Sequence, residues 1–305
     1  ANGNHGQTAT SVISDCGKTH GHTGPSQAQC NSAYAAGSSF LKSVSVVNGI
    51  QKFTVPTTGS YEITAVAPGG AQQENAEVHG RGATVTGTVA LTQGDTLWVL
   101  VGQQSDYYKA STDEREWIGG SGGTFVAKGS SLASSVPLVV AGGAGGHRSK
   151  KTTENALMNG ACSTDAKDGS RVGGSDTTSG SNAGLTVGFG YGGKGGYGGQ
   201  NGRAMSGSHT PGGGAGFYGD GEASTDTRRG ATVRAYAFRN GGNGGLFGPG
   251  YNTKPIDGGF GGGGSGAWGG TGGGGGCCGG GGDPNPGHSG GGGSYSVSGL
   301  SGRCT

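Results

Sequence analysis

Glycine is the feature that most limits what this chain can fold into. It accounts for 78 of the 305 residues, about one in four, whereas an average protein contains about 7%. Glycine has no side chain to bury and loses more conformational freedom on folding than any other residue. Because only 30% of the residues are hydrophobic, side-chain packing alone cannot order the whole chain. We therefore expect main-chain contacts to order the glycine-rich part.

The large apolar side chains are concentrated between residues 40 and 140, and most glycines come later. Short Val- and Thr-rich runs alternate with turn residues such as Pro56, Gly59 and Gly94, which is typical of β-strands. We expect residues 50–55 and 61–66 to form a hairpin, with further strands at 83–89, 96–101, 124–127 and 137–140. The sequence predicts an all-β fold, a jelly-roll antiparallel β-sandwich.

In the glycine-rich part, the other residues recur every three positions. The clearest runs are YGGKGGYGGQ at 191–200 and NGGNGGL at 240–246. A polyproline II-type helix has three residues per turn, so two of its three edges would be bare backbone that can pair with neighbouring helices. We favour an inserted bundle of polyglycine-II helices over a flexible linker. Collagen is excluded, because it needs a strict repeat rich in proline and this chain has only nine prolines.

An ordered set of motifs resembles a known family. The motifs are SGGTFVAK at 121–128, VPLVVAGGAGG at 136–146, GGGAGFYGD at 212–220, FRNGGNGG at 238–245, GGFGGGGSGAW at 258–268 and GGGGSY at 290–295. Together they resemble the glycine-rich extracellular domain of the anaplastic lymphoma kinase and leukocyte tyrosine kinase receptors and of related secreted proteins, over roughly residues 45–298. The resemblance implies a tumour-necrosis-factor-like sandwich that carries polyglycine helices, with a returning strand near the end of the chain. In the receptors, this domain binds protein ligands.

These patterns divide the chain into four parts. We expect an N-terminal arm at 1–40, the main part of the sandwich at 41–145, the glycine-rich region with loops at 146–289, and a returning strand and tail at 290–305. The arm lies outside the resemblance. The chain begins at Ala1 without a methionine or an apolar leader, which is compatible with a removed secretory signal or with a trimmed chain.

The six cysteines predict disulfides in an extracellular protein. They are Cys16, Cys30, Cys162, Cys277, Cys278 and Cys304. Cys16 and Cys30 are expected to close the arm, whereas the adjacent Cys277 and Cys278 are expected to reach Cys162 and Cys304 in either order. Cys16, His20, His22 and Cys30 also have the residue types of a zinc site, but their spacing fits no standard one. We therefore expect a disulfide and no metal.

No catalytic constellation emerges, and we expect neither enzymatic activity nor a cofactor. Glycine richness produces accidental motifs, such as GGSGG at 119–123, which fits a nucleophile elbow without its strand-to-helix context. The net charge of +2 gives no basic face for nucleic acid. No apolar run is long enough to span a membrane.

Three functions fit such a scaffold. We favour an extracellular structural protein whose copies assemble into a filament or coat, since sandwiches with exposed edges are natural assembly units. The alternative is a recognition or adhesion module for a protein or glycan, for which exposed aromatic residues are candidate contacts. These candidates are Tyr191, Tyr197, Trp268, Trp117 and Tyr251. The third is ice binding by a flat face of polyglycine helices.

Overall fold

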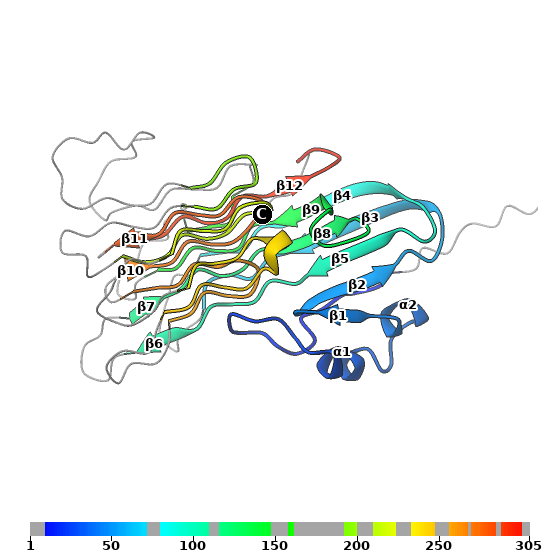
Figure 1. Cartoon of the computed structure of the whole chain (residues 1–305), viewed down its shortest axis with the longest axis horizontal. Helices are drawn as coiled ribbons and strands as arrows, with labels where there is room; N and C mark the ends of the chain where they lie inside the picture. The colour runs from blue at the N-terminus through cyan, green and yellow to red at the C-terminus, as the bar shows by residue number, and fades with distance from the viewer. Residues whose placement is uncertain are drawn as a thin grey trace, which may run out of the picture.

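The chain folds mostly into antiparallel β-structure with little helix (Figure 1). The computed structural model describes residues 10–71, 80–109, 116–147, 158–161, 192–199, 210–223, 233–247, 256–267, 270–284 and 288–300. The longer strands lie at one end of an elongated molecule, and the glycine-rich segments run side by side at the other end together with some of the short strands (Figure 1). Two short helices, α1 (Gln27–Ala33) and α2 (Ser39–Lys42), lie beside the strands.

The main sheet has six strands in the order β1-β2-β5-β8-β9-β12, and each neighbouring pair is antiparallel. Its strands are β1 (Ser45–Val47), β2 (Ile50–Thr54), β5 (Thr96–Leu100), β8 (Thr124–Lys128), β9 (Val136–Ala141) and β12 (Tyr295–Ser296). β12 comes from the last part of the sequence and pairs with β9, so this segment returns to form an edge strand of the main sheet.

Three further pairs of strands form small sheets. They are β3 (Gly59–Val66) with β4 (Thr84–Leu91), β6 (Tyr107–Lys109) with β7 (Glu116–Ile118), and β10 (Gly270–Thr271) with β11 (Asp283–Pro284). β3 and β4 pair over eight residues. In β4 every second side chain is buried, whereas in β3 exposed side chains alternate mostly with half-buried ones, as expected for a sheet with one solvated face. This sheet packs over β8 and β9.

The hairpin predicted from residues 50–55 and 61–66 is wrong. β2 pairs with β1 and β5 in the main sheet, whereas β3 pairs with β4 in the second layer. The segment with Pro56 and Gly59 therefore carries the chain from one layer to the other. The alternation of apolar and polar residues predicts which side chains face the core, but it does not predict which strands are neighbours.

One face of the main sheet packs on β3, β4 and the N-terminal arm. Val85, Val89, Val99 and Val126 belong to this core, and Phe40 of α2 stacks on Phe53 with 4.9 Å between ring centroids. The arm also contributes polar contacts, because the Tyr34 hydroxyl donates to Gln51 Oε1 at 2.7 Å. The arm thus completes the layer that β3 and β4 begin.

The opposite face of the main sheet holds the glycine-rich region through aromatic side chains. Phe125 of β8 stacks on Phe238 at 5.0 Å, and Phe238 stacks on Phe217 at 4.9 Å. Phe260 and Trp98 join the same buried cluster. The glycine-rich region is therefore anchored by a few phenylalanines, although most of its residues offer no side chain.

Main-chain hydrogen bonds connect the glycine-rich segments to one another with a period of three. The N–H groups of residues 120–123 donate, in chain order, to the carbonyls of Gly264, Ala144, Gln103 and Gly261. The first three acceptors lie in three different segments, and the fourth lies in the same segment as the first. Residues 143–146 repeat the pattern, with acceptors in order at Gly275, Pro68, Met158 and Gly272. Each such segment is thus surrounded by others that satisfy its backbone.

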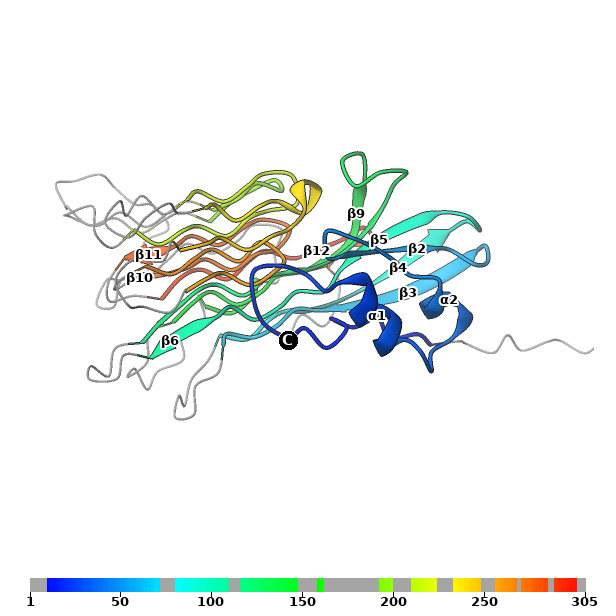
Figure 2. The ribbon, with the colours of Figure 1, turned by 60° about the horizontal axis from the view of Figure 1, so that its bottom comes forward.

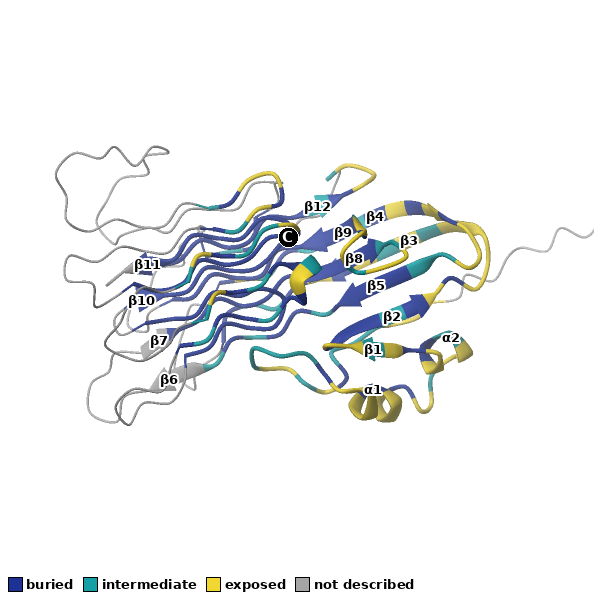
Figure 3. Cartoon of the chain, in the orientation of Figure 1, coloured by how far each residue is buried: buried dark blue, intermediate teal, exposed yellow. Residues whose placement is uncertain are grey.

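Close packing explains why these positions hold glycine. A Cβ on Gly120 would overlap the carbonyl of Gly273, and a Cβ on Gly273 would overlap the carbonyl of Gly280. These segments are buried almost throughout (Figure 3). Backbone atoms occupy the space that side chains fill in an ordinary core.

The N-terminal arm reaches both parts of the molecule. Cys16 and Cys30 form a disulfide with an S–S distance of 1.99 Å. Between them, the Gly21 N–H donates to Gln104 O at 3.1 Å, and Gly21 O accepts from Phe260 N at 2.7 Å. The arm therefore lies along the glycine-rich region as one more hydrogen-bonded segment. In Figure 2 it crosses in front of the junction between the two parts.

The edge of β1 is capped by the side chain of Gln27. Its Oε1 accepts from Val46 N at 2.8 Å, and its Nε2 donates to Val44 O at 3.1 Å. The amide thus imitates a neighbouring strand and satisfies an edge that could otherwise pair with another chain.

We expect Gln27→Ala to lower the free energy of unfolding by about 1 kcal/mol, because two edge groups lose their partner. The stability of Gln27→Glu should lie between that of Gln27→Ala and that of the wild type, since glutamate keeps an acceptor for Val46 N but has no donor for Val44 O. Chemical denaturation would measure the loss, and light scattering would report any new self-association. Equal stability of Gln27→Ala and the wild type would refute the capping role.

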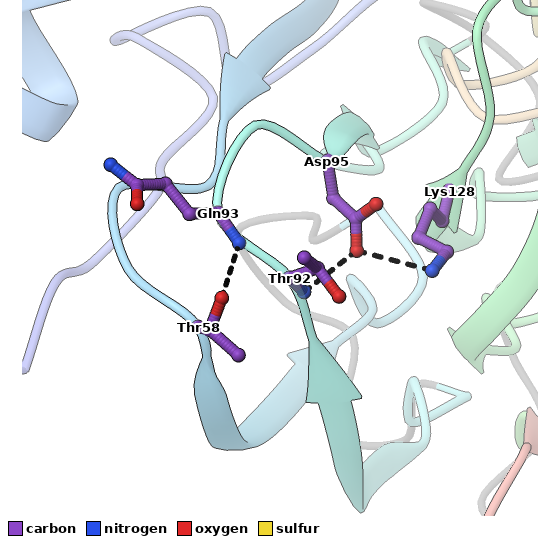
Figure 4. Close-up of polar contacts among 5 residues, drawn as sticks. All are labelled: Thr58, Thr92, Gln93, Asp95 and Lys128. Carbon is purple, nitrogen blue, oxygen red and sulfur yellow. Dashed lines mark hydrogen bonds and ion pairs between the residues drawn. The ribbon is translucent and has the colours of Figure 1, made fainter.

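Polar side chains fix the far end of the sandwich (Figure 4). Asp95 Oδ2 accepts from Thr92 N at 2.9 Å and lies 3.1 Å from Lys128 Nζ, while Gln93 N donates to Thr58 Oγ1 at 2.9 Å. The hydrogen bond from Thr92, with that from Lys128, lowers the pKa of the Asp95 carboxyl from its ordinary value of 3.8.

A lowered carboxyl pKa makes this corner sensitive to acid. The stabilisation by Asp95 should be fully present above pH 3.8 and lost as the pH falls through the lower folded-state pKa. We expect Asp95→Asn to be less stable than the wild type at pH 7, and the difference to shrink as the pH falls below 3.8. Thermal unfolding across this range would test it, and a constant difference at every pH would contradict it.

Candidate recognition surface

Three turns of the glycine-rich region meet on one surface. They are residues 194–197, 217–220 and 238–240, and the last is a short 3-10 helix, Phe238–Asn240. The Tyr218 N–H donates to Gly196 O at 2.8 Å, and the Phe238 N–H donates to Gly216 O at 3.1 Å. We call the outer side chains of these turns the turn surface; they are Lys194, Tyr197, Tyr218, Arg239 and Asn240.

Glycine makes the first turn possible and brings the two tyrosines together. Gly195 and Gly196 have φ angles of 59° and 91°, a left-handed pair typical of tight turns. A Cβ on Gly196 would overlap the Tyr218 ring, and one on Gly219 would lie 2.7 Å from Tyr197 Cδ1. The ring of each tyrosine therefore rests on a glycine of the other turn. Tyr197 is 64% exposed and Tyr218 is 41% exposed.

Arg239 joins the turns to the main sheet. Its guanidinium lies 4.6 Å from the centroid of the Tyr218 ring, and it donates through Nε and Nη2 to the carbonyl of Ser135, in the loop before β9. Figure 2 shows the 3-10 helix, in yellow, beside that loop. The hydrogen bonds and the cation–π contact hold the positive charge at a fixed place on the surface.

The turn surface carries positive charge and free hydroxyls. Neither Lys194 nor Arg239 forms an ion pair with any residue in the described ranges, and neither tyrosine hydroxyl has a hydrogen-bond partner there. Asp220 lies in the same turns, where its Oδ1 accepts from Ala237 N and Asn240 Nδ2, each at 2.8 Å. Donors and an aromatic face are thus available to a partner.

Of the five aromatic contacts predicted from the sequence, Tyr197 lies on this surface. Trp117 belongs to β7, and the positions of Tyr191, Tyr251 and Trp268 fall outside the described residues. Sequence reasoning missed Tyr218 and Arg239. The signal that could have found them is the pair of interrupted glycine runs GGGAGFYGD and FRNGGNGG, because bulky residues inside such runs must lie where the segments turn.

The structure confirms the disulfide that the sequence predicts for the N-terminal arm. Cys16 and Cys30 are bonded to each other, so their thiolates are not available to zinc. Cys277 and Cys278 are buried with their Sγ atoms 3.8 Å apart, too far for a bond between them. Cys162 and Cys304 fall outside the described residues, so the predicted bridges to them remain a prediction.

A second polar cluster lies where the arm meets the glycine-rich region. The carboxylate of Asp257, only 6% exposed, accepts from Phe247 N at 3.0 Å and lies 3.2 Å from His22 Nδ1. Burial raises the pKa of the nearby Asp106, and the charge of Asp257 adds to this effect, while His20, His22 and Lys18 oppose it. No group of three or more described His, Cys, Asp or Glu side chains here or elsewhere is arranged to hold a metal.

We expect Asp106→Asn to stabilise the protein at pH 7. A raised carboxyl pKa means that the ionised form is penalised in the folded state, and this penalty is present above the folded-state pKa and absent below the ordinary value of 3.8. The variant should therefore melt at a higher temperature than the wild type at pH 7 and at the same temperature at pH 3. A lower melting temperature at pH 7 would show that the charge is needed.

No model of a known protein family matches the chain. A stretch of 97 residues, 30% of the chain, is 37% identical to part of the leukocyte tyrosine kinase receptor of Mus musculus. The chain covers 11% of that receptor's length, so the similarity concerns a segment of the receptor. It supports the resemblance found in the sequence over part of the chain. No helix in the described ranges is long and apolar enough to cross a bilayer.

Proposed function

We propose that this protein is an extracellular recognition or adhesion module without enzymatic activity, and that the turn surface is its contact site. The observation that carries the proposal is the pair of exposed tyrosines beside Lys194 and Arg239, held by turns that are anchored to the main sheet. Tyrosine and arginine are enriched among residues that dominate binding energy. A rigid surface also loses little entropy when it binds.

An extracellular location is supported by two findings. The Cys16–Cys30 disulfide is a kind of bond that persists in oxidising compartments. The partial similarity to a receptor segment points the same way. We therefore propose that the protein is secreted or exposed on a cell surface.

We further propose that the glycine-rich segments are a bundle of polyglycine-II helices inserted into a jelly-roll sandwich of the tumour-necrosis-factor type. The three-residue return of their hydrogen bonds supports this architecture, because a helix with three residues per turn points every third N–H toward the same neighbour. Amide hydrogen exchange would test the bundle. The N–H groups of residues 120–123 and 143–146 should be strongly protected, and rapid exchange there would exclude a bundle.

The recognition role can be tested on arrays of glycans and of purified extracellular domains. The fluorescent protein should bind at least one target saturably, and Tyr197→Ala should weaken that binding about tenfold. Val47→Ala, which removes an exposed side chain from β1, is the matched control and should bind normally. No binding, or binding unaffected by Tyr197→Ala, would refute the proposal.

Self-assembly is the second candidate, and one observation favours it. β3 and β4 pair with each other and with no other described strand, so the outer edge of an eight-residue strand is offered to another copy. The β1 edge, in contrast, is covered by Gln27. Assembly would therefore use the second layer.

Light scattering at increasing protein concentration would test assembly. If copies pair through β3, the mass should rise with concentration, and Val66→Lys should prevent the rise, because a charge on an edge strand opposes pairing. Val66 is 58% exposed, so this substitution should leave the fold intact. A monomer at every concentration would exclude this candidate.

A further inference from the structure

We propose that the turn surface binds a polysaccharide that carries carboxylate or sulfate groups. This inference rests on the recognition role and names the class of its partner. It follows from three properties of the surface: the sign of its net charge, the exposure of its aromatic rings, and the small number of apolar side chains among its members.

The charge of the surface suits an anionic ligand. Lys194 is exposed, and neither Lys194 nor Arg239 is neutralised by an ion pair in the described part of the chain. Asp220 carries the opposing charge, so Lys194, Arg239 and Asp220 give the three turns a net charge of +1. The Oδ1 of Asp220 accepts from Ala237 N and Asn240 Nδ2. The ammonium of Lys194 and the guanidinium of Arg239 are both donors that match carboxylate and sulfate oxygens.

The aromatic part suits a sugar ring. Tyr197 lies against Gly219 and is 64% exposed, which leaves much of its ring open to a flat apolar face of a sugar. The hydroxyls of Tyr197 and Tyr218 have no partner in the described ranges, so they can hydrogen-bond to ring substituents. A polysaccharide presents apolar ring faces and polar substituents along one chain, and the tyrosines offer a contact for each.

The composition of the turn surface disfavours a protein partner. A typical protein interface buries about 800 Å² on each side and has an apolar centre. On the turn surface, the two tyrosines are the only exposed large hydrophobic residues, and the other members are Lys194, Arg239 and Asn240. Because three of its five members are polar or charged, the turn surface fits a sugar polymer better than an apolar protein partner.

Immobilised polymers can test the partner class directly. The probes are heparin and chondroitin sulfate as anionic polysaccharides, dextran as a neutral one, and polyglutamate as an acidic polypeptide. The full chain should bind a sulfated polymer saturably and dextran at least tenfold more weakly, and the binding should weaken as salt is raised. Lys194→Gln and Tyr197→Ala should each weaken binding about fivefold to tenfold.

The controls keep the proposal falsifiable. Lys42→Gln removes an equal charge from exposed Lys42 on α2 and should leave binding unchanged, and unfolding curves would show that every variant is folded. An equal loss with Lys42→Gln, or equal binding to dextran, would overturn the inference. Preference for polyglutamate, with loss in Tyr197→Ala, would also overturn it while leaving the recognition role intact. Array targets that bind through Tyr197 without any sulfated polymer would do the same.

Discussion

Gly120→Ala is expected to destabilise the protein by about 3 kcal/mol, the upper part of the range for forced overpacking. The new Cβ would overlap the carbonyl of Gly273, and Gly120 N donates to Gly264 O at 2.9 Å. Both neighbours are backbone, which cannot change rotamer to make room. The segments would have to separate, and separation would break several hydrogen bonds together. Urea unfolding followed by circular dichroism would measure the loss.

Gly59→Ala is the matched control for this substitution. Gly59 begins β3, and a Cβ there would meet only Tyr61, at 4.0 Å. The control should therefore change stability by no more than a few tenths of a kcal/mol. If Gly120→Ala cost no more than Gly59→Ala, the close approach of the glycine segments could not be what orders this region.

Phe238→Ala should have the second large effect, a loss of about 3–5 kcal/mol as for other buried phenylalanines. Phe238 lies between Phe125 of the main sheet and Phe217, and it is 1% exposed. Removing its ring would interrupt the stack that attaches the glycine-rich region to the sheet. We therefore expect the wild type to unfold in one transition and the variant in two, with the glycine-rich region of the variant exchanging its amides first.

Phe238→Leu keeps apolar volume without the stacked ring, so it should lose less stability and keep one transition. Hydrogen exchange read by mass spectrometry would follow residues 120–123 and 124–128 separately. A cooperative transition in Phe238→Ala with the same protection in both segments would mean that the hydrogen-bonded backbone joins the two parts without the aromatic stack.

The sequence predicted the strands better than their pairing. Alternation in 61–66 and 83–89 located β3 and β4, and continuous apolar character located β5. The period of two is a local property, so it identifies a strand and its buried face. Pairing depends on long-range closure, and for this reason β2 and β3 were wrongly joined although they lie in different layers.

The helices and the turn surface were harder to predict. α1 begins at a capping box in which Ser26 and Gln29 bond reciprocally, but its seven residues show too little apolar periodicity to indicate a helix. Tyr197 could be proposed from its place in a triplet run. The interrupted glycine runs point to Arg239 and Tyr218 as turn residues, but the contact between them could not be predicted, because it depends on how three turns from distant parts of the chain meet.

The pairing of β12 with β9 has a consequence for how the protein is made. Tyr295 and Ser296 complete the sheet only after some 150 intervening residues have been synthesised, and Gly274 N and Cys277 N donate to Gly290 O and Gly293 O. Contacts so distant along the chain slow folding. A ribosome-bound chain that has not yet emerged beyond residue 290 would expose an unfinished sheet and unsatisfied glycine amides. We expect its folding to be largely post-translational and to depend on protection of that intermediate from aggregation.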